Sequence, residues 1–231
     1  MKLWVVGILL ALLGVIALVG VWEVDVEKIG PLDLSLEEKA TLLELARATL
    51  RDELAGEGAP AVDESNLSAN LKAEAACFVT LNKDGRLRGC MLDSFMPHEP
   101  IYKNVMRNVM LAATNDPRFP PVSVDELESI KIEISVLGSS YAIGFESPEE
   151  LLASLRPGID GVILTTSFGS STYLPQVWEQ LPDSDVFLTE LCRKHGAPGD
   201  CWKMDDLLRV EVYQVNHFGE SEFSEVEADG D

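Results

Sequence analysis

The chain has 231 residues, of which 39 are acidic and 18 are basic, and its formal net charge is −21. This acidic excess, with no visible cluster of Lys and Arg, argues against nucleic-acid binding, because that function relies on neutralising phosphates. The chain beyond residue 34 is long enough to bury one sizeable core, so we expect one main domain.

The first feature along the chain is an apolar run, residues 3–22, that carries no charge. It is long enough to cross a ~30 Å hydrocarbon layer as a helix. This predicts a transmembrane anchor at 1–26 and a linker at 27–34. A cleaved signal peptide is the alternative, although its apolar core normally runs about 7 to 15 residues. Lys2 before the run and acidic residues after it favour a single-pass protein with its domain outside the cytoplasm; the cytoplasmic side stays open as an alternative.

The expected domain, residues 35–220, begins with a helix, since Ser35 followed by Glu38 has the form of a capping box. Two apolar runs around Asn-Lys-Asp-Gly then predict a β-hairpin. Its register decides whether Cys77 and Cys90 face each other, and the sequence leaves that open.

The remaining elements follow from apolar periodicity. Helices are expected within residues 99–114, 147–155 and 184–196, and strands within 130–137, 161–167 and 208–215. Strands with one polar face and hairpin turns favour an α+β domain with an antiparallel sheet and flanking helices. The acidic tail, residues 221–231, is expected to be disordered.

The chemistry of the hairpin centres on Cys90. Arg88 precedes it by two residues and would share a strand face with it, where a guanidinium would lower the pKa of the thiol and attract an anion. In this reading Cys90 is a catalytic nucleophile, and Asp93, His98 or His195 would have to supply the base. The alternatives are a small buried strand residue and a disulfide with Cys77.

The motifs RLRGCMLDS, DPRFPPVSVDELESIKIEISVL, LRPGIDGVIL, TYLPQVWEQLP and FLTELCRKHGAPGDCW together resemble the AMMECR domain family, protein A of the AmmeMemoRadiSam system. The resemblance covers about residues 35–220 and leaves out the apolar N-terminal run. It implies one α+β domain, often described as two β-β-β-α-α units, and an unsettled biochemical activity. The implied partners are a Memo-type protein and a radical SAM enzyme.

The family signature is Leu-Arg-Gly-Cys-Ile-Gly, and residues 87–90 match it. Met91 and Leu92 stand where the family usually has Ile and Gly, so Leu92 would narrow or fill whatever the motif cradles. Cys201 replaces the family's usual alanine, which suggests a disulfide with Cys192, against the alternative of two separate core thiols.

The functional prediction is a membrane-anchored accessory domain that binds a ligand or partner. Its expected binding residues are Arg88 and Gly89 in the signature, and Arg118 and Asp160 in two loops. A Cys90-dependent enzyme with an unknown, anionic substrate is the alternative. We expect no metal and no cofactor, because the Cys and His spacings do not fit a zinc site and no nucleotide-binding glycine pattern occurs.

Overall fold

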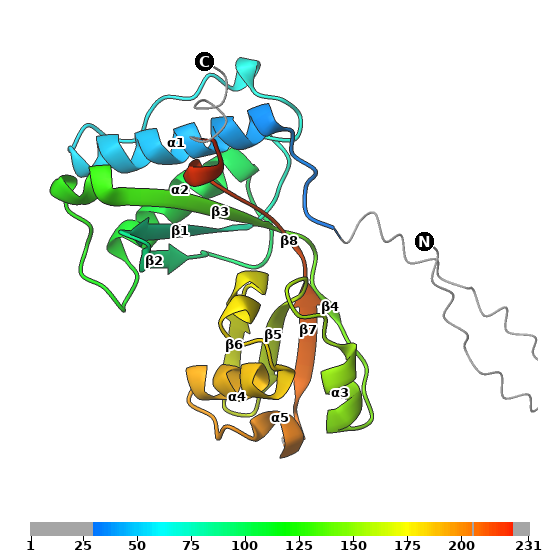
Figure 1. The fold of residues 1–231 in the computed structure, drawn as a ribbon. Helices are drawn as coiled ribbons and strands as arrows, with labels where there is room; N and C mark the ends of the chain where they lie inside the picture. The colour runs from blue at the N-terminus through cyan, green and yellow to red at the C-terminus, as the bar shows by residue number, and fades with distance from the viewer. Residues whose placement is uncertain (1–29, 205, 224–231) are drawn as a thin grey trace, which may run out of the picture.

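A computed structural model describes residues 30–204 and 206–223 of the chain. These residues form two lobes, each built on a four-stranded antiparallel sheet (Figure 1). The first lobe has strand order β2-β1-β3-β8, and the second has β4-β7-β5-β6. The second lobe is inserted between β3 and β8, so the chain leaves the first sheet and returns to it.

The first lobe carries two long helices on one face of its sheet. Its elements are α1 (Leu36–Leu54), η2 (Glu64–Asn66), β1 (Cys77–Lys83), β2 (Arg86–Met91), α2 (Ile101–Thr114), η3 (Val124–Ser129), β3 (Ile130–Leu137) and β8 (Val215–Gly219). The predicted capping box of Ser35 and Glu38 opens α1. Leu42, Ala46 and Leu50 of this helix are fully buried against the sheet and α2, which explains why an amphipathic helix forms here.

The hairpin of β1 and β2 turns at Asp84 and Gly85, which both have positive φ, as a two-residue hairpin turn requires. Its register places Thr80 opposite Cys90. Cys77 lies three residues before Thr80 in β1, so it does not face Cys90. Both cysteines are free, and the alternative of a Cys77–Cys90 disulfide is wrong.

The second lobe packs its helices on its own sheet. Its elements are β4 (Tyr141–Ala142), α3 (Pro148–Ser154), β5 (Gly161–Thr166), β6 (Gly169–Tyr173), η4 (Pro175–Glu179), α4 (Ser184–Lys194), α5 (Cys201–Met204) and β7 (Arg209–Tyr213). A disulfide joins Cys192 at the end of α4 to Cys201 at the start of α5. Both cysteines are buried beside Trp202 and Leu188, so the bridge ties the two helices to the core of this lobe.

The sheet faces that the helices leave uncovered meet between the lobes. Leu137 of β3, Ile163 of β5 and Tyr213 of β7 form an apolar cluster there, and Leu92 packs against it. Leu92, the residue expected to alter the family motif, thus contributes to the contact between the lobes.

The α+β class and the antiparallel pairing are confirmed, but the expected single sheet is two sheets. The chain also stays ordered beyond residue 220, in a helical turn that ends at Phe223, whose ring packs on the first core. The rest of the predicted tail lies outside the described residues.

The predicted membrane location needs correction. Within residues 30–204 and 206–223, no helix has both the length and the apolar character needed to span a bilayer. The expected spanning segment, residues 3–22, lies outside the described part of the chain. The described part of the chain therefore does not support the prediction of a single-pass membrane protein.

Candidate functional site

Gly89 brings α2 against the hairpin. A Cβ atom at this position would lie 2.1 Å from the backbone carbonyl oxygen of Ala112 in α2. No side chain fits there, so the glycine of the Arg-Gly-Cys motif permits close packing of helix on strand. Because α2 packs so closely on β2 at Gly89, the loop after α2, which begins at Asn115, lies beside Cys90.

Cys90 lies on the other face of β2, toward the second lobe, and is half-buried. The Thr80 hydroxyl, directly across the hairpin, donates a hydrogen bond to its sulfur at 3.3 Å. The Cys90 backbone N–H donates to the Asp116 carboxylate at 2.9 Å, and its carbonyl accepts from Arg118 at 3.3 Å. Asp116 and Arg118, both in the loop after α2, therefore bind the backbone N–H and the backbone carbonyl of Cys90.

Asp116 is the centre of this arrangement. Its buried carboxylate also accepts from the backbone N–H, Nε and Nη2 of Arg118, at 3.1, 2.9 and 2.6 Å. Burial alone would raise the pKa of Asp116, but hydrogen bonds from Arg118 and from the backbone N–H of Cys90 lower it to about 2. Asp116 is thus ionised at neutral pH and fixes the guanidinium of Arg118 beside Cys90.

Arg88 does not act on the Cys90 thiol. The pairing of β1 with β2 shifts by one residue between Leu81 and Asn82, so a bulge breaks simple alternation at Arg88. Its guanidinium forms a two-pronged ion pair with Glu126 of η3, at 3.0 and 2.9 Å, and also donates to the carbonyl of Pro121. The expectation that Arg88 would lower the pKa of the thiol fails because the bulge turns its side chain to Glu126.

The second lobe supplies the other cation. Lys194, the last residue of α4, donates from Nζ to the carbonyl of Thr172 at 2.8 Å and lies 4.7 Å from the ring centre of Tyr173. Burial lowers the pKa of Lys194, and the positive charge of Arg118 lowers it further. Lys194 and Arg118, from different lobes, thus come close enough to repel each other beside Cys90.

The thiol itself is not activated. Burial raises the pKa of Cys90 and outweighs the opposite influence of the Thr80 hydrogen bond, Arg118 and Lys194, while Asp116 adds to the rise. The thiol is protonated at neutral pH, whereas a nucleophilic cysteine needs a lowered pKa or a neighbouring base.

The three residues expected to supply a base lie elsewhere. The Asp93 carboxylate accepts from Asn104 and from the N–H of Ser94. His98 is exposed and lies 3.3 Å from Asp93, and His195 sits between the hydroxyls of Thr166 and Ser171. Within the described chain, the recorded partner of the Cys90 sulfur is Thr80.

Asp160, the last of the expected binding residues, is a structural residue of the second lobe. Its buried carboxylate accepts from the backbone and side chain of Arg156, and its carbonyl accepts from the indole of Trp178 at 2.7 Å. These bonds close the loop before β5, so Asp160 lies outside the group around Cys90.

Among the described residues, Asp93, His98 and Glu99 bring three metal-binding side chains together. The two carboxylates already accept hydrogen bonds from Asn104, and Glu99 also pairs with Arg107. The cluster is therefore satisfied by neighbouring side chains.

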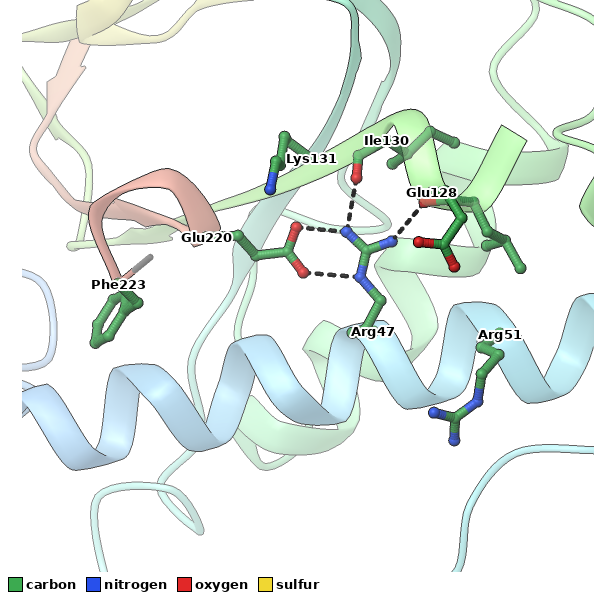
Figure 2. A pocket seen from close by; sticks show the side chains of 8 residues that line it. Arg47, Arg51, Glu128, Ile130, Lys131, Glu220 and Phe223 are labelled. Carbon is green, nitrogen blue, oxygen red and sulfur yellow. Dashed lines mark hydrogen bonds and ion pairs between the residues drawn. The ribbon is translucent and has the colours of Figure 1, made fainter. Parts of the chain in front are cut away.

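A cavity lies between α1 and the C-terminal turn, and the side chain of Arg47 that lines it is paired with other groups of the chain. Figure 2 shows Arg47 directed at Glu220 and at the carbonyl of Ile130; it also donates to the carbonyl of Leu127. All these bonds fasten the turn after β8 and the end of η3 to α1, so we assign Arg47 a structural role.

Asp116 and Lys194 were not among the predicted site residues. Asp116 stands two residues before Arg118 in a loop already singled out, and an aspartate before proline at the end of a helix was the available signal. Lys194 gave no comparable signal, because the fold alone brings the end of α4 to the hairpin.

Fold and site together define a two-lobed α+β domain in which a hairpin cysteine is flanked by an Arg–Asp pair and by a lysine of the second lobe. The chain belongs to the AMMECR1 family, whose sequence model matches residues 43–218.

Its relatives include archaeal proteins. A protein of Methanothermobacter thermautotrophicus is 35% identical over 188 residues, which cover 81% of this chain and 96% of the relative. Protein MJ0810 of Methanocaldococcus jannaschii is 35% identical over 201 residues, covering 86% and 95%. The crystal structure of uncharacterized protein PH0010 from Pyrococcus horikoshii is similar with a TM-score of 0.71 and 32% identity, covering 78% of this chain and 90% of that one. The family resemblance is confirmed.

Proposed function

We propose that this domain binds a small anionic ligand at the junction of its lobes, between Arg118 and Lys194 and next to Cys90. The observation that carries the proposal is geometric: Arg118, held by Asp116, donates to the carbonyl of Cys90 from the first lobe, and Lys194 of the second lobe lies near enough for its pKa, lowered mainly by burial, to be lowered further by the charge of Arg118. An anion between the two cations would relieve their repulsion. The chain as a whole has a net charge of −21, so a paired-cation site stands out against its surroundings.

The alternative of a Cys90-dependent enzyme has less support. The pKa of the thiol is raised, and within the described residues the hydrogen-bond partner of the sulfur is Thr80 and not a base, so the site does not supply an activated nucleophile. In this proposal Cys90 and Thr80 instead line the site and offer weak hydrogen-bonding groups to the ligand. The Memo-type and radical SAM partners stay a prediction from the family.

The test is calorimetric titration with inorganic phosphate. We expect saturable binding by the wild-type protein and at least about a tenfold loss of affinity in Lys194→Gln, equivalent to about 1.4 kcal/mol. Lys203→Gln is the matched control, because Lys203 is exposed at the far end of the same lobe and packs over Trp202. Absence of saturable phosphate binding, or equal affinity in Lys194→Gln, would contradict the proposal.

A further inference from the structure

The amine of Lys194 is held at one place and can still be reached from solvent. Its Nζ atom donates to the carbonyl of Thr172 at 2.8 Å and lies 4.7 Å from the ring centre of Tyr173. The residue nevertheless keeps exposed surface, so a small molecule can approach the nitrogen. A neutral amine carries two N–H groups, so one can stay on the Thr172 carbonyl while the lone pair is left for another atom.

The surroundings of Lys194 favour the neutral amine, which is the nucleophilic form. Partial burial lowers the pKa of Lys194, and the charge of Arg118 lowers it further, whereas Cys90 acts in the opposite direction. Because burial raises the pKa of the Cys90 thiol, that thiol is uncharged at neutral pH and does not hold the amine in its charged form. Desolvation and a neighbouring cation are the two conditions that activate a lysine as a nucleophile.

Arg118 provides a group that can orient a ligand beside this amine. Its Nε and Nη2 atoms donate to the Asp116 carboxylate at 2.9 and 2.6 Å, and Nη2 also donates to the carbonyl of Cys90. Half of the side-chain surface of Arg118 is exposed, and within the described residues no hydrogen bond uses its Nη1 atom. A fixed guanidinium with free N–H groups is suited to a carboxylate or a phosphate.

We propose that Lys194 forms an imine with an aldehyde or ketone that carries a carboxylate or a phosphate. The inference rests on the proposed anion site and names the chemical class of its ligand, whose anionic group Arg118 binds. The amine nitrogen of Lys194 bonds to the carbonyl carbon, and one amine proton passes to the carbonyl oxygen. The resulting carbinolamine loses water, which takes the hydroxyl group and the remaining N–H proton, and a C=N bond is left. No oxidant or reductant takes part.

The test is reductive trapping in the full-length wild-type protein at pH 7. The two probes are glyoxylate, an anionic aldehyde, and glycolaldehyde, a neutral aldehyde with the same number of carbons. Cyanoborohydride supplies the hydride that reduces an imine to a stable secondary amine, and peptide mass spectrometry gives the rate at each lysine. Lys203 is the matched internal control, because it is also exposed and lies 4.6 Å from the centre of an aromatic ring, that of Trp202.

We expect glyoxylate to modify Lys194 at least about tenfold faster than Lys203, and glycolaldehyde to show a clearly smaller preference. This comparison is made within one wild-type protein, so it does not depend on the folding of a variant. Saturating inorganic phosphate should protect Lys194 from glyoxylate. Arg118→Gln should slow glyoxylate trapping at Lys194 at least about fivefold, whereas Arg193→Gln, which removes an exposed neighbouring cation, should leave it unchanged.

The inference is overturned if glyoxylate modifies Lys194 no faster than Lys203, if glycolaldehyde shows the same preference for Lys194, or if Arg118→Gln has no effect. Should phosphate still bind saturably in any of these cases, the anion site stands and the imine chemistry alone fails. The absence of both phosphate binding and phosphate protection of Lys194 would instead remove the anion site, and this inference with it.

Discussion

Replacing Gly89 with alanine should lower the free energy of unfolding by about 3 kcal/mol or more. The added Cβ atom would lie 2.1 Å from the carbonyl oxygen of Ala112 and 3.0 Å from its carbonyl carbon. Both are backbone atoms of α2, so no side chain can rotate away, and the helix must move off the hairpin. Urea denaturation of wild-type and Gly89→Ala proteins measures the loss.

The matched control for this change is Gly144→Ala. Gly144 is exposed in a loop of the second lobe, and a Cβ atom there would meet no atom within 4 Å. We expect its free energy of unfolding to stay within about 0.5 kcal/mol of the wild type. A Gly89→Ala protein as stable as Gly144→Ala would show that α2 does not pack on β2 as described.

Replacing Asp116 with asparagine should lower the free energy of unfolding by about 2 kcal/mol at pH 7, and this loss should be smaller in acid. The folded pKa of Asp116, about 2, lies below its ordinary value of 3.8. Its ionised form therefore stabilises the fold above the unfolded pKa, and this contribution disappears as the pH falls through the folded pKa. By pH 3 about half of it should be gone.

Denaturant titrations of Asp116→Asn and wild type at pH 7 and pH 3 measure how the difference between their free energies of unfolding decreases in acid. Asp33→Asn serves as the control, because Asp33 is an exposed carboxylate before α1, and its gap to the wild type should be small at both pH values. A gap for Asp116→Asn that is constant from pH 7 to pH 3 would show that the ionised carboxylate does not hold Arg118 and Cys90 together.

Much of the fold could be predicted from the sequence because its signals are local. The Ser35 capping box, the Asp84-Gly85 turn and the alternating apolar residues of β3 each depend on neighbours within a few positions. Strand β6 was missed because its sequence, Gly-Ser-Ser-Thr-Tyr, has no apolar alternation, and its pairing with β5 makes it a strand. The family resemblance implied two β-β-β-α-α units, but which strands share a sheet depends on partners that are distant in the chain, so the local pattern could not predict the two sheets.

The candidate site was predicted in part. The sequence pointed to Cys90 and Arg118, which the structure brings together, because both stand in distinctive local motifs. It paired Cys90 with Arg88 by strand alternation, and a bulge that no local pattern announced defeats that rule. Lys194 follows Cys90 by more than one hundred residues, so only the packing of the two lobes brings Lys194 near Cys90.

The proposed anion site rests on a positive electrostatic potential at Cys90, and alkylation of that thiol can measure it. Iodoacetate and iodoacetamide both react with the same thiolate, which displaces iodide, so the ratio of their rates cancels the thiolate fraction and reports the local charge. Cys77 is fully buried, burial raises its pKa, and Cys192 and Cys201 are in a disulfide, so the reaction at Cys90 can be followed alone by peptide mass spectrometry.

We expect the ratio of iodoacetate to iodoacetamide rates at Cys90 to exceed that of free cysteine, despite the net charge of −21. We also expect Lys194→Met to lower this ratio severalfold and Lys203→Met to leave it unchanged. A wild-type ratio below that of free cysteine, or one that Lys194→Met does not alter, would contradict an anion site between Arg118 and Lys194.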